Sequence, residues 1–380
     1  MEELSFYKDI LFYNGKFYTE SDLLKTVSLH NRLYTPFMPS KISDNIIDDD
    51  NNILYFNKGI LLLDSFHSNI GHLLWDFMYP SWYGLFYFLE NNSNDDFQWI
   101  TEKDIDPQNG GWHLDILEKF SGNPITTLNL FSKLYDKPIR IPWLIAGMSV
   151  GIGCVNTNLL VKRELKDHIN DPIEMFINRM YSRYNIERNI INNINTKNII
   201  YIVNKRPQYG IEYIFEKLKI KYNGYNFNII NLYDYNFNEQ LNIFNNSCII
   251  IVGVGTARIN SPFLPNGAIE IQIGDYDSSS TNFIQYFDYH HGTLSKYIKV
   301  LNIEYYTKEE AEQRLVSGKL ENYIETAIEN IPFNVPINLE DNIPLEIKKI
   351  ENKIKNNLDI FKQWRNSGSN NIKDLLNILK

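Results

Sequence analysis

The chain has few cysteines, no long apolar run and fewer basic than acidic residues, and each of these features disfavours a class of protein. It has only two cysteines in 380 residues, Cys154 and Cys248. Both lie in apolar runs, which predicts buried thiols and no disulfide framework. No stretch approaches the roughly 18 uninterrupted apolar residues of a membrane-spanning helix, and the N-terminus lacks the basic and apolar regions of a signal peptide. We therefore expect a soluble, cytoplasmic protein without a transmembrane segment.

Acidic residues outnumber basic ones, 46 to 37, and the net charge is -9 with an isoelectric point near 5.4. This balance disfavours nucleic acid or an anionic membrane surface as a general partner. The chain is 43% hydrophobic and exceeds the length at which a single core usually stops growing. Two domains are therefore expected.

The second half, from residue 198 to about 300, has the pattern of a doubly wound domain. Its short apolar runs are NIIYIVNK, FNIINLY, SCIIIVGVG and GAIEIQIG, and segments of helical period, YGIEYIFEKLKI and NFNEQLNIFNN, separate the first three. Such alternation predicts a parallel sheet with crossover helices, as in a Rossmann-like domain. Before it, Asp171 and Pro172 form a helix start, with an N-cap oxygen and a proline at the first helical position.

The first half is less regular and predicts a mixed α/β domain. Strands are expected at ILYF, GILLLDSF and IRIPWLIAG, with an aromatic helix over 70–90. Near the C-terminus, apolar residues from Ile347 to Phe361 recur at spacings of three and four, which predicts an amphipathic helix that packs back on the first domain. The predicted division is 1–184 for the first α/β domain, 185–335 for the Rossmann-like domain, and 336–380 for a returning strap and helix.

The segment NIGHLLWD interrupts an apolar stretch with three polar residues. Asn69, His72 and Asp76 are three and four residues apart, so on a helix capped by Ser68 or Asn69 they share one face. A carboxylate one turn away orients an imidazole and makes it more basic, as a general base near neutral pH requires. The alternative is a core histidine that hydrogen-bonds within its own helix.

Two cations follow an apolar strand in YIVNKRPQ. Ligands of open α/β sheets gather at the carboxyl ends of strands, so Lys205 and Arg206 are candidates to bind a diphosphate. The alternative is a pair of solvated surface cations.

A glycine loop follows the strand SCIIIV. Gly253 and Gly255 allow the backbone to approach a ligand, and the amides of the helix start after them can hold phosphate oxygens. The loop lacks the third glycine of the dinucleotide fingerprint and the GK[ST] of a P-loop, which disfavours a dehydrogenase and a P-loop ATPase. Glu270, on the next strand, is either a ribose ligand or an ordinary strand carboxylate.

Together these segments resemble glycosyltransferase family 61. The resemblance rests on Asn69-Ile-Gly-His72-Leu-Leu-Trp-Asp76, on Val203-Asn-Lys205-Arg206, and on Gly253-Val-Gly255 followed by Phe263-Leu-Pro-Asn-Gly267 and Glu270. It implies a GT-B fold, in which two Rossmann-like domains face a cleft. It also implies inverting transfer of a sugar from a nucleotide-sugar, with UDP as the expected nucleotide, to a hydroxyl of a glycan or glycoprotein. No metal or other cofactor is obligatory in this reading.

The resemblance also implies roles for individual residues. Lys205 and Arg206 point toward the diphosphate, Glu270 toward the ribose, and His72 or Asp76 is the base, with Asn69 beside them. The residues implied at the glycine loop are Gly253, Gly255, Thr256 and Arg258. The family's usual G-L-[ST]-N is here Gly255-Thr-Ala-Arg258, with extra residues before Phe263, and its second arginine after the basic strand is not evident.

Other readings stay open. Asp275 and Asp277 form a DxD pattern that holds Mg²⁺ or Mn²⁺ in metal-dependent GT-A transferases. The altered loop is compatible with an inactive sugar- or protein-binding relative, and a hydrolase with paired carboxylates would need no nucleotide. No G-x-S-x-G elbow supports serine chemistry. His290 and His291 are adjacent and lack a suitably spaced third ligand, which favours structural roles over a metal site.

Overall fold

The computed structural model divides the chain into two compact units, Met1–Ile186 and Glu187–Lys380. The sequence analysis expected this boundary between residues 184 and 185. The residues that the structure describes are 3–19, 25–28, 39–42, 54–55, 58–62, 70–79, 81–82, 85, 96–101, 111–134, 137–148, 172–189, 197–203, 211–253, 256–273, 299–303 and 319–331. The predicted strap and helix at 336–380 lie outside them.

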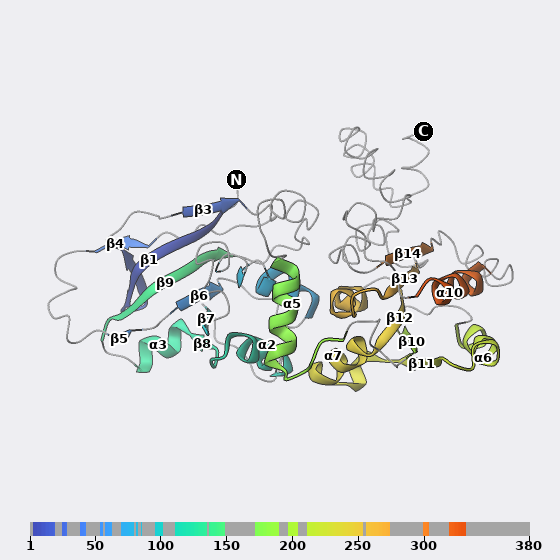
Figure 1. The fold of residues 1–380 in the computed structure, drawn as a ribbon. Coiled ribbons are helices and arrows are strands. Elements are labelled where there is room, and N and C mark those ends of the chain that lie inside the picture. The colour runs from blue at the N-terminus through green and yellow to red at the C-terminus, as the bar shows by residue number, and fades with distance from the viewer. Residues whose placement is uncertain are drawn as a thin grey trace, which may run out of the picture. The chain divides into compact units, whose positions relative to one another are not determined.

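The first unit contains a parallel arrangement of four strands (Figure 1). They are β6 (Lys58–Leu62), β7 (Gln98–Thr101), β8 (Thr126–Thr127) and β9 (Ile139–Met148). Their order across the sheet is β9-β6-β7-β8, and each neighbouring pair is parallel. By position in the chain this is the order 3-2-1-4 of a Rossmann half, read from the β8 side.

Five further strands, three of them in antiparallel pairs, extend this sheet to nine strands. β1 (Glu3–Tyr13) pairs with β9, with β2 (Lys16–Thr19) and with β3 (Lys25–Ser28), and the short β4 (Ser40–Lys41) and β5 (Leu54–Tyr55) complete it. Asn14 and Gly15 both have positive φ, the conformation of a two-residue hairpin turn, and they join β1 to β2. The mixed α/β prediction is confirmed, although the sequence analysis did not predict this antiparallel extension.

The helices of the first unit pack through aromatic rings. They are the π-helix η3 (His72–Met78), α2 (Gly111–Ser121), α3 (Leu128–Leu134) and α5 (Pro172–Arg183). Phe176 of α5 lies at the centre, with ring centroids 5.6 Å from Trp75, 5.8 Å from Trp82 and 4.8 Å from Phe120. α5 begins at Pro172, as predicted, because proline at the first helical position sacrifices no helical hydrogen bond.

The second unit contains a five-stranded sheet in which every pairing is parallel. Its strands are β10 (Asn198–Ile202), β11 (Asn226–Ile230), β12 (Ser247–Val252), β13 (Ile269–Ile273) and β14 (Lys299–Ile303). The order is β11-β10-β12-β13-β14, or 2-1-3-4-5 by position in the chain, which is the flavodoxin-like doubly wound order. The predicted parallel sheet is thus confirmed.

Helices of the second unit lie on both faces of its sheet. α6 (Ile211–Lys221) packs Phe215 against Tyr201 of β10, with ring centroids 6.5 Å apart. α10 (Lys319–Glu329) is tied to α6 by the ion pairs Lys217–Glu321 and Lys221–Glu325. Because crossovers are right-handed, α7 (Phe237–Asn245), which leads back from β11 to β12, covers the opposite face. No helix in the described ranges is long and apolar enough to span a membrane.

Candidate functional site

The second unit has one topological switch point, between β10 and β12. The chain leaves β10 toward β11 on one side and leaves β12 toward β13 on the other. Ligands of doubly wound sheets bind outside the carboxyl ends of the strands at such a point. Ile202 and Val252 are register partners at these ends, so Val203 and Gly253 leave the sheet side by side. The structure therefore brings together the starts of the basic segment and of the glycine loop.

The residues predicted in these two loops are described only in part. Gly253 is buried at the end of β12. Lys205, Arg206 and Gly255 lie outside the described residues, and for Thr256 and Arg258 the structure describes the backbone but not the side chains. Their roles stay predictions.

The 3₁₀-helix η7 (Thr256–Phe263) is the next described element after β12 and the glycine loop. It starts four residues after β12 ends, and at its other end Phe263 packs on Phe237, with ring centroids 6.0 Å apart. Phe237 begins α7, which follows the carboxyl end of β11. The start of η7 therefore follows the carboxyl end of β12 closely, and its last residue packs on the start of α7.

Two buried polar residues of η7 were missed by the sequence analysis. Asn260 is 2% exposed and Ser261 is fully buried. Within the part of the chain that the structure describes, no donor reaches Asn260 Oδ1. The sequence signal that could have identified them is their position between the glycine loop and Phe263-Leu264-Pro265. Polar residues are not expected at buried positions of an apolar core.

Glu270 lies inside the sheet and not at its edge. It is the second residue of β13, is in register with Ile250 of β12, and is fully buried. Side chains alternate between faces along a strand, and Tyr201 faces α6, so Glu270 is on the opposite face, which α7 covers. Its predicted contact with ribose stays a prediction.

The first unit also has a switch point, between β6 and β9. These strands are the first and the last of its parallel group but are neighbours in the sheet, and Leu62 and Met148 are register partners at their carboxyl ends. The helical segment that carries His72 is the next described element after β6. The candidate base therefore follows the strand end where a ligand of this unit would be expected.

The helix that carries His72 differs from the prediction, which assumed α-helical geometry. Residues His72–Met78 form a π-helix, and the amide of Tyr79 donates to the carbonyl of Leu74, five residues back. A π-helical turn takes more than four residues, so residues four apart still lie on one side, and such turns are frequent at functional sites. The backbones of His72 and Asp76 are described but not their side chains, and Asn69 lies outside the described residues.

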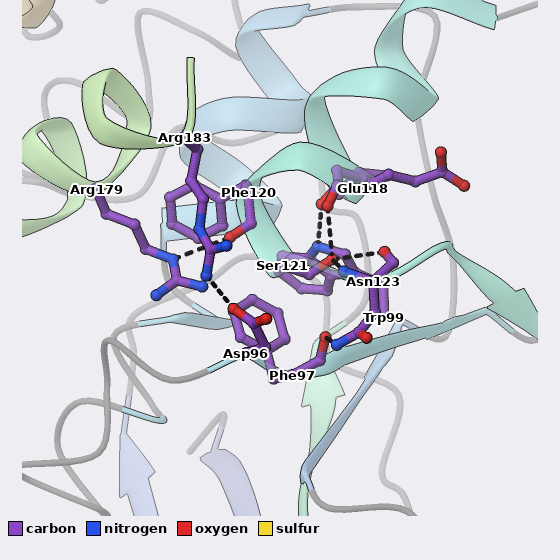
Figure 2. A network of polar contacts seen from close by, with 10 residues as sticks. Asp96, Phe97, Trp99, Glu118, Phe120, Ser121, Asn123, Arg179 and Arg183 are labelled. Atoms are coloured by element: carbon purple, nitrogen blue, oxygen red, sulfur yellow. Dashed lines mark hydrogen bonds and ion pairs between the residues drawn. The ribbon is translucent and has the colours of Figure 1, made fainter. Parts of the chain in front are cut away.

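Aromatic packing fixes the other side of this π-helix. Leu74, Trp75 and Met78 are buried, and Trp75 and Tyr79 pack on Phe176 of α5. The cation of Arg179, also on α5, lies over the rings of Phe97 and Phe120, and its Nε donates to the carbonyl of Phe120 at 2.9 Å (Figure 2). α5 thus joins the π-helix to β7 and α2 through one aromatic cluster.

A second polar network closes the amino end of β7. Arg183 pairs with Asp96, the amide of Phe97 donates to the carbonyl of Ser121, and Asn123 Nδ2 donates to the carbonyl of Phe97 (Figure 2). Gly122 ends α2 at φ +83°, and a Cβ there would meet the Asp96 carboxylate. The side chains of this network hydrogen-bond to neighbouring strand and helix ends, so their role is structural.

Asparagines close the amino edge of the sheet in the second unit. Asn245 Oδ1 accepts from the amide of Asn189, and its Nδ2 donates to the carbonyl of Glu187, both at 2.8 Å. Asn198 Nδ2 donates to the carbonyl of Asn246, and Asn226 Nδ2 donates to Asn198 Oδ1. The two bonds of Asn245 hold the start of the unit, residues 187–189, against the end of α7, and the other two join the end of α7 to the start of β10, and the start of β10 to the start of β11.

Comparison with known proteins gives a family for the chain. The model of the family Glycosyltransferase 61 matches residues 70–271, more than half of the 380 residues. No curated protein matches the chain. The matched range starts at the helix that carries His72 and ends within β13, so it includes both strands of the second unit's switch point but not β6 of the first. The chain therefore belongs to glycosyltransferase family 61, and it is a glycosyltransferase.

Proposed function

We propose that this glycosyltransferase transfers a sugar, with inversion and without an obligatory metal, from a nucleotide-sugar to a hydroxyl of a glycan or glycoprotein. UDP is the expected nucleotide, the expected arrangement is GT-B, and the small number of cysteines favours a cytoplasmic location. The single observation that supports the proposal most is the juxtaposition of Val203 and Gly253 at the switch point of the second unit. The basic segment with Lys205 and Arg206 begins at Val203, and the glycine loop begins at Gly253. Both segments are predicted to contact the diphosphate.

The donor half of the reaction requires positive charge near the leaving group. Lys205 and Arg206 follow Val203 directly, and charge-assisted hydrogen bonds from such side chains to a diphosphate are stronger than neutral ones. Backbone amides at the start of η7 and the hydroxyl of Thr256 are further donors for its oxygens. These groups stabilise the negative charge that develops as the bond from the anomeric carbon to the phosphate oxygen breaks.

The acceptor half requires a base. In the proposed step His72, oriented by Asp76, takes the proton of the acceptor hydroxyl, and the hydroxyl oxygen bonds to the anomeric carbon from the face opposite the diphosphate. The nucleoside diphosphate leaves with the electron pair of the broken bond. One displacement of this kind inverts the anomeric configuration. Asp76 is the alternative base, since either side chain of the pair can take the proton.

A metal-dependent reaction is the second candidate. Asp275 and Asp277 would then hold Mg²⁺ or Mn²⁺ against the diphosphate, in place of Lys205 and Arg206. Both aspartates lie outside the described residues. The metal-dependent candidate would need a metal ion to bind the nucleotide. An inactive relative would bind the nucleotide without turnover.

A calorimetric and thermal-shift screen tests the proposal. The purified chain is titrated with UDP, GDP, CDP and dTDP and with their sugars, once with EDTA and once with Mn²⁺. We expect one nucleotide, UDP, to bind in EDTA and to raise the Tm. Binding only with Mn²⁺ would favour Asp275 and Asp277, binding without turnover an inactive relative, and failure of every nucleotide to bind would contradict a nucleotide-sugar donor.

A further inference from the structure

One side of the π-helix η3 packs on a phenylalanine of α5. Trp75 and Tyr79 are four residues apart, and both lie against Phe176, with ring centroids 5.6 Å and 5.4 Å from it and 5.9 Å from each other. Phe176 is fully buried, and the other two rings are 1% and 3% exposed. Aromatic rings at such distances attract one another in preferred relative orientations. The three rings therefore determine how this side of η3 meets α5.

The residues of this contact alternate along the chain with the predicted base and its partner. Asp76 directly follows Trp75, and His72 lies four residues before Asp76. A π-helical turn takes more than four residues, so each pair four apart forms a column along the helix, and the two columns lie about a quarter of a turn apart. Any rotation of η3 on Phe176 therefore turns the positions of His72 and Asp76 by the same angle.

The π-helical geometry of η3 itself depends on packing. The helix has only seven residues, and isolated helices of this length are marginal in water. π-helices are also rare, so α-helical geometry would be the default for this segment. The amide of Tyr79 nevertheless donates to the carbonyl of Leu74, five residues back. Contacts outside the segment must select this geometry, and the rings of Trp75 and Tyr79 on Phe176 span the turn in question.

Phe176 is itself held in a packed position. Its ring centroid lies 4.8 Å from that of Phe120 in α2 and 5.8 Å from that of Trp82. Arg179, about one turn further along α5, places its cation over the Phe120 ring, and its Nε donates to the Phe120 carbonyl (Figure 2). A close-packed interior leaves a ring little room to shift. Phe176 therefore links the position of η3 to those of α5 and α2.

We propose that Phe176 is a positioning residue for sugar transfer. Through Trp75 and Tyr79 it sets the rotation of η3, and with it the approach of the base to the acceptor hydroxyl. The proposal rests on the proposed function, in which His72 or Asp76 takes the acceptor proton. Phe176 belongs to none of the segments in which site residues were predicted. A displacement of about 1 Å at a reacting group can lower a rate about 100-fold, so a small rotation of η3 is sufficient.

Phe97 provides a matched control in the same unit. It is also buried, at 1% exposure, and its ring lies 4.8 Å from Trp99 and 6.2 Å from Phe120, with the cation of Arg179 over it. Within the described ranges it has no ring contact with η3. Phe176→Leu and Phe97→Leu therefore each remove one ring from the same aromatic cluster, and only the first removes the ring on which η3 packs.

The test measures Tm, Kd for UDP, and release of UDP from UDP-glucose with water as the acceptor, or the equivalent pair for whichever nucleotide binds in the screen. Both variants should lower the Tm by a similar amount, about 5 °C, because each removes part of a packed core. Phe176→Leu should lower kcat by about 10- to 100-fold at an unchanged Kd, and Phe97→Leu should change neither. If Phe176→Leu does not fold, Phe176→Met replaces it, because methionine fills more of the volume of the lost ring.

A double variant tests whether Phe176 acts through the base. In a His72→Ala background the base is already lost, so addition of Phe176→Leu should lower kcat by no more than about twofold. Asp76→Asn replaces His72→Ala if the latter retains turnover. Hydrogen exchange of a peptide covering 72–79 is measured in parallel and needs no acceptor. It should be faster in Phe176→Leu than in the wild type, and unchanged in Phe97→Leu.

Three results would overturn the inference. They are an equal loss of kcat in Phe97→Leu, a full further loss of kcat in the background without the base, and exchange over 72–79 that is the same in both single variants. Unchanged kcat in Phe176→Leu would also overturn it and leave the proposed function intact, because His72→Ala and Asp76→Asn test the base independently. If the wild type binds no nucleotide, the proposed function fails, and this inference fails with it.

Discussion

The two edges of the second unit's sheet use polar residues in opposite ways. At the amino edge, the side chains of Asn245 and Asn198 hydrogen-bond to backbone groups. Asn245 bonds to the backbone of Asn189 and Glu187, and Asn198 bonds to the carbonyl of Asn246. At the carboxyl edge, Gly253 opens the glycine loop, and Val203 leaves β10 beside it. The hydrogen bonds of the first edge stabilise the fold, whereas the two segments with predicted ligand residues begin at the second edge. This difference predicts that a ligand binds at the carboxyl edge.

The first unit shows the same division. The polar network around Asp96, Ser121 and Asn123 closes the amino end of β7 (Figure 2). The helix with His72, in contrast, follows the carboxyl end of β6. Substitutions at amino edges should therefore change stability, and substitutions at carboxyl edges should change binding or turnover. Each prediction below tests one side of this division.

The largest effect is expected for His72→Ala. Loss of a general base should lower turnover by about 10²- to 10⁴-fold, while the Tm stays close to that of the wild type because the apolar side of the π-helix is untouched. Initial rates of sugar transfer and thermal unfolding measure the two effects. Unchanged turnover would exclude His72 as the base, and Asp76→Asn then decides whether its neighbour has that role.

Lys205→Ala and Arg206→Ala should each weaken binding of the nucleoside diphosphate by about 10- to 100-fold, since each removes a charge-assisted hydrogen bond. Isothermal titration at low and high salt measures the loss. Lys217→Ala is the matched control, because this exposed lysine forms an ion pair with Glu321 of α10. If Lys217→Ala weakens binding as much as Arg206→Ala, general surface charge and not the switch point attracts the nucleotide.

Gly122→Ala should lower the free energy of unfolding by about 1–2 kcal/mol without a change in nucleotide affinity. The residue has φ +83°, which disfavours a side chain, and its Cβ would displace the Asp96 carboxylate that pairs with Arg183. Gly224→Ala is the control, because a Cβ there has only Lys197 Nζ within 4 Å, at 3.9 Å. Urea unfolding compares the two, and equal stabilities would argue against a structural role for this network.

The smallest effect concerns Cys248, near the amino edge. Burial raises the pKa of its thiol from 9.0 to about 12, and Sγ hydrogen-bonds to the carbonyl of Asn198 at 3.2 Å. The raised pKa contributes stability that is complete below pH 9 and is lost as the pH rises from 9 toward 12, about 1 kcal/mol by pH 10. In a Cys154→Ser background, native protein at pH 8 should resist iodoacetamide. Rapid labelling before unfolding would contradict this.

Much of the second unit was predictable from the sequence, because continuous apolar strands and amphipathic helices carry strong local signals. The runs NIIYIV and SCIIIVGVG became β10 and β12 at nearly the expected residues. The strand order could not be read, since it depends on long-range pairing, and it is this order that puts Val203 beside Gly253.

The first unit was harder to predict for physical reasons. The π-helix depends on how Trp75 and Tyr79 pack on Phe176, which lies far away in the sequence. β1 is a long strand without strict alternation, and its pairing with β9 spans most of the unit. The burial of Asn260 could not be predicted either, because the sequence does not show which asparagines leave the surface.

Hydrogen–deuterium exchange with and without UDP tests the central claim most directly. The account predicts that bound nucleotide slows exchange in peptides covering 203–210 and 253–263, at the carboxyl edge of the second unit, and leaves 187–198 and 245–248 unchanged. Protection confined to the amino edge, or no protection at the carboxyl edge despite measured binding, would contradict it.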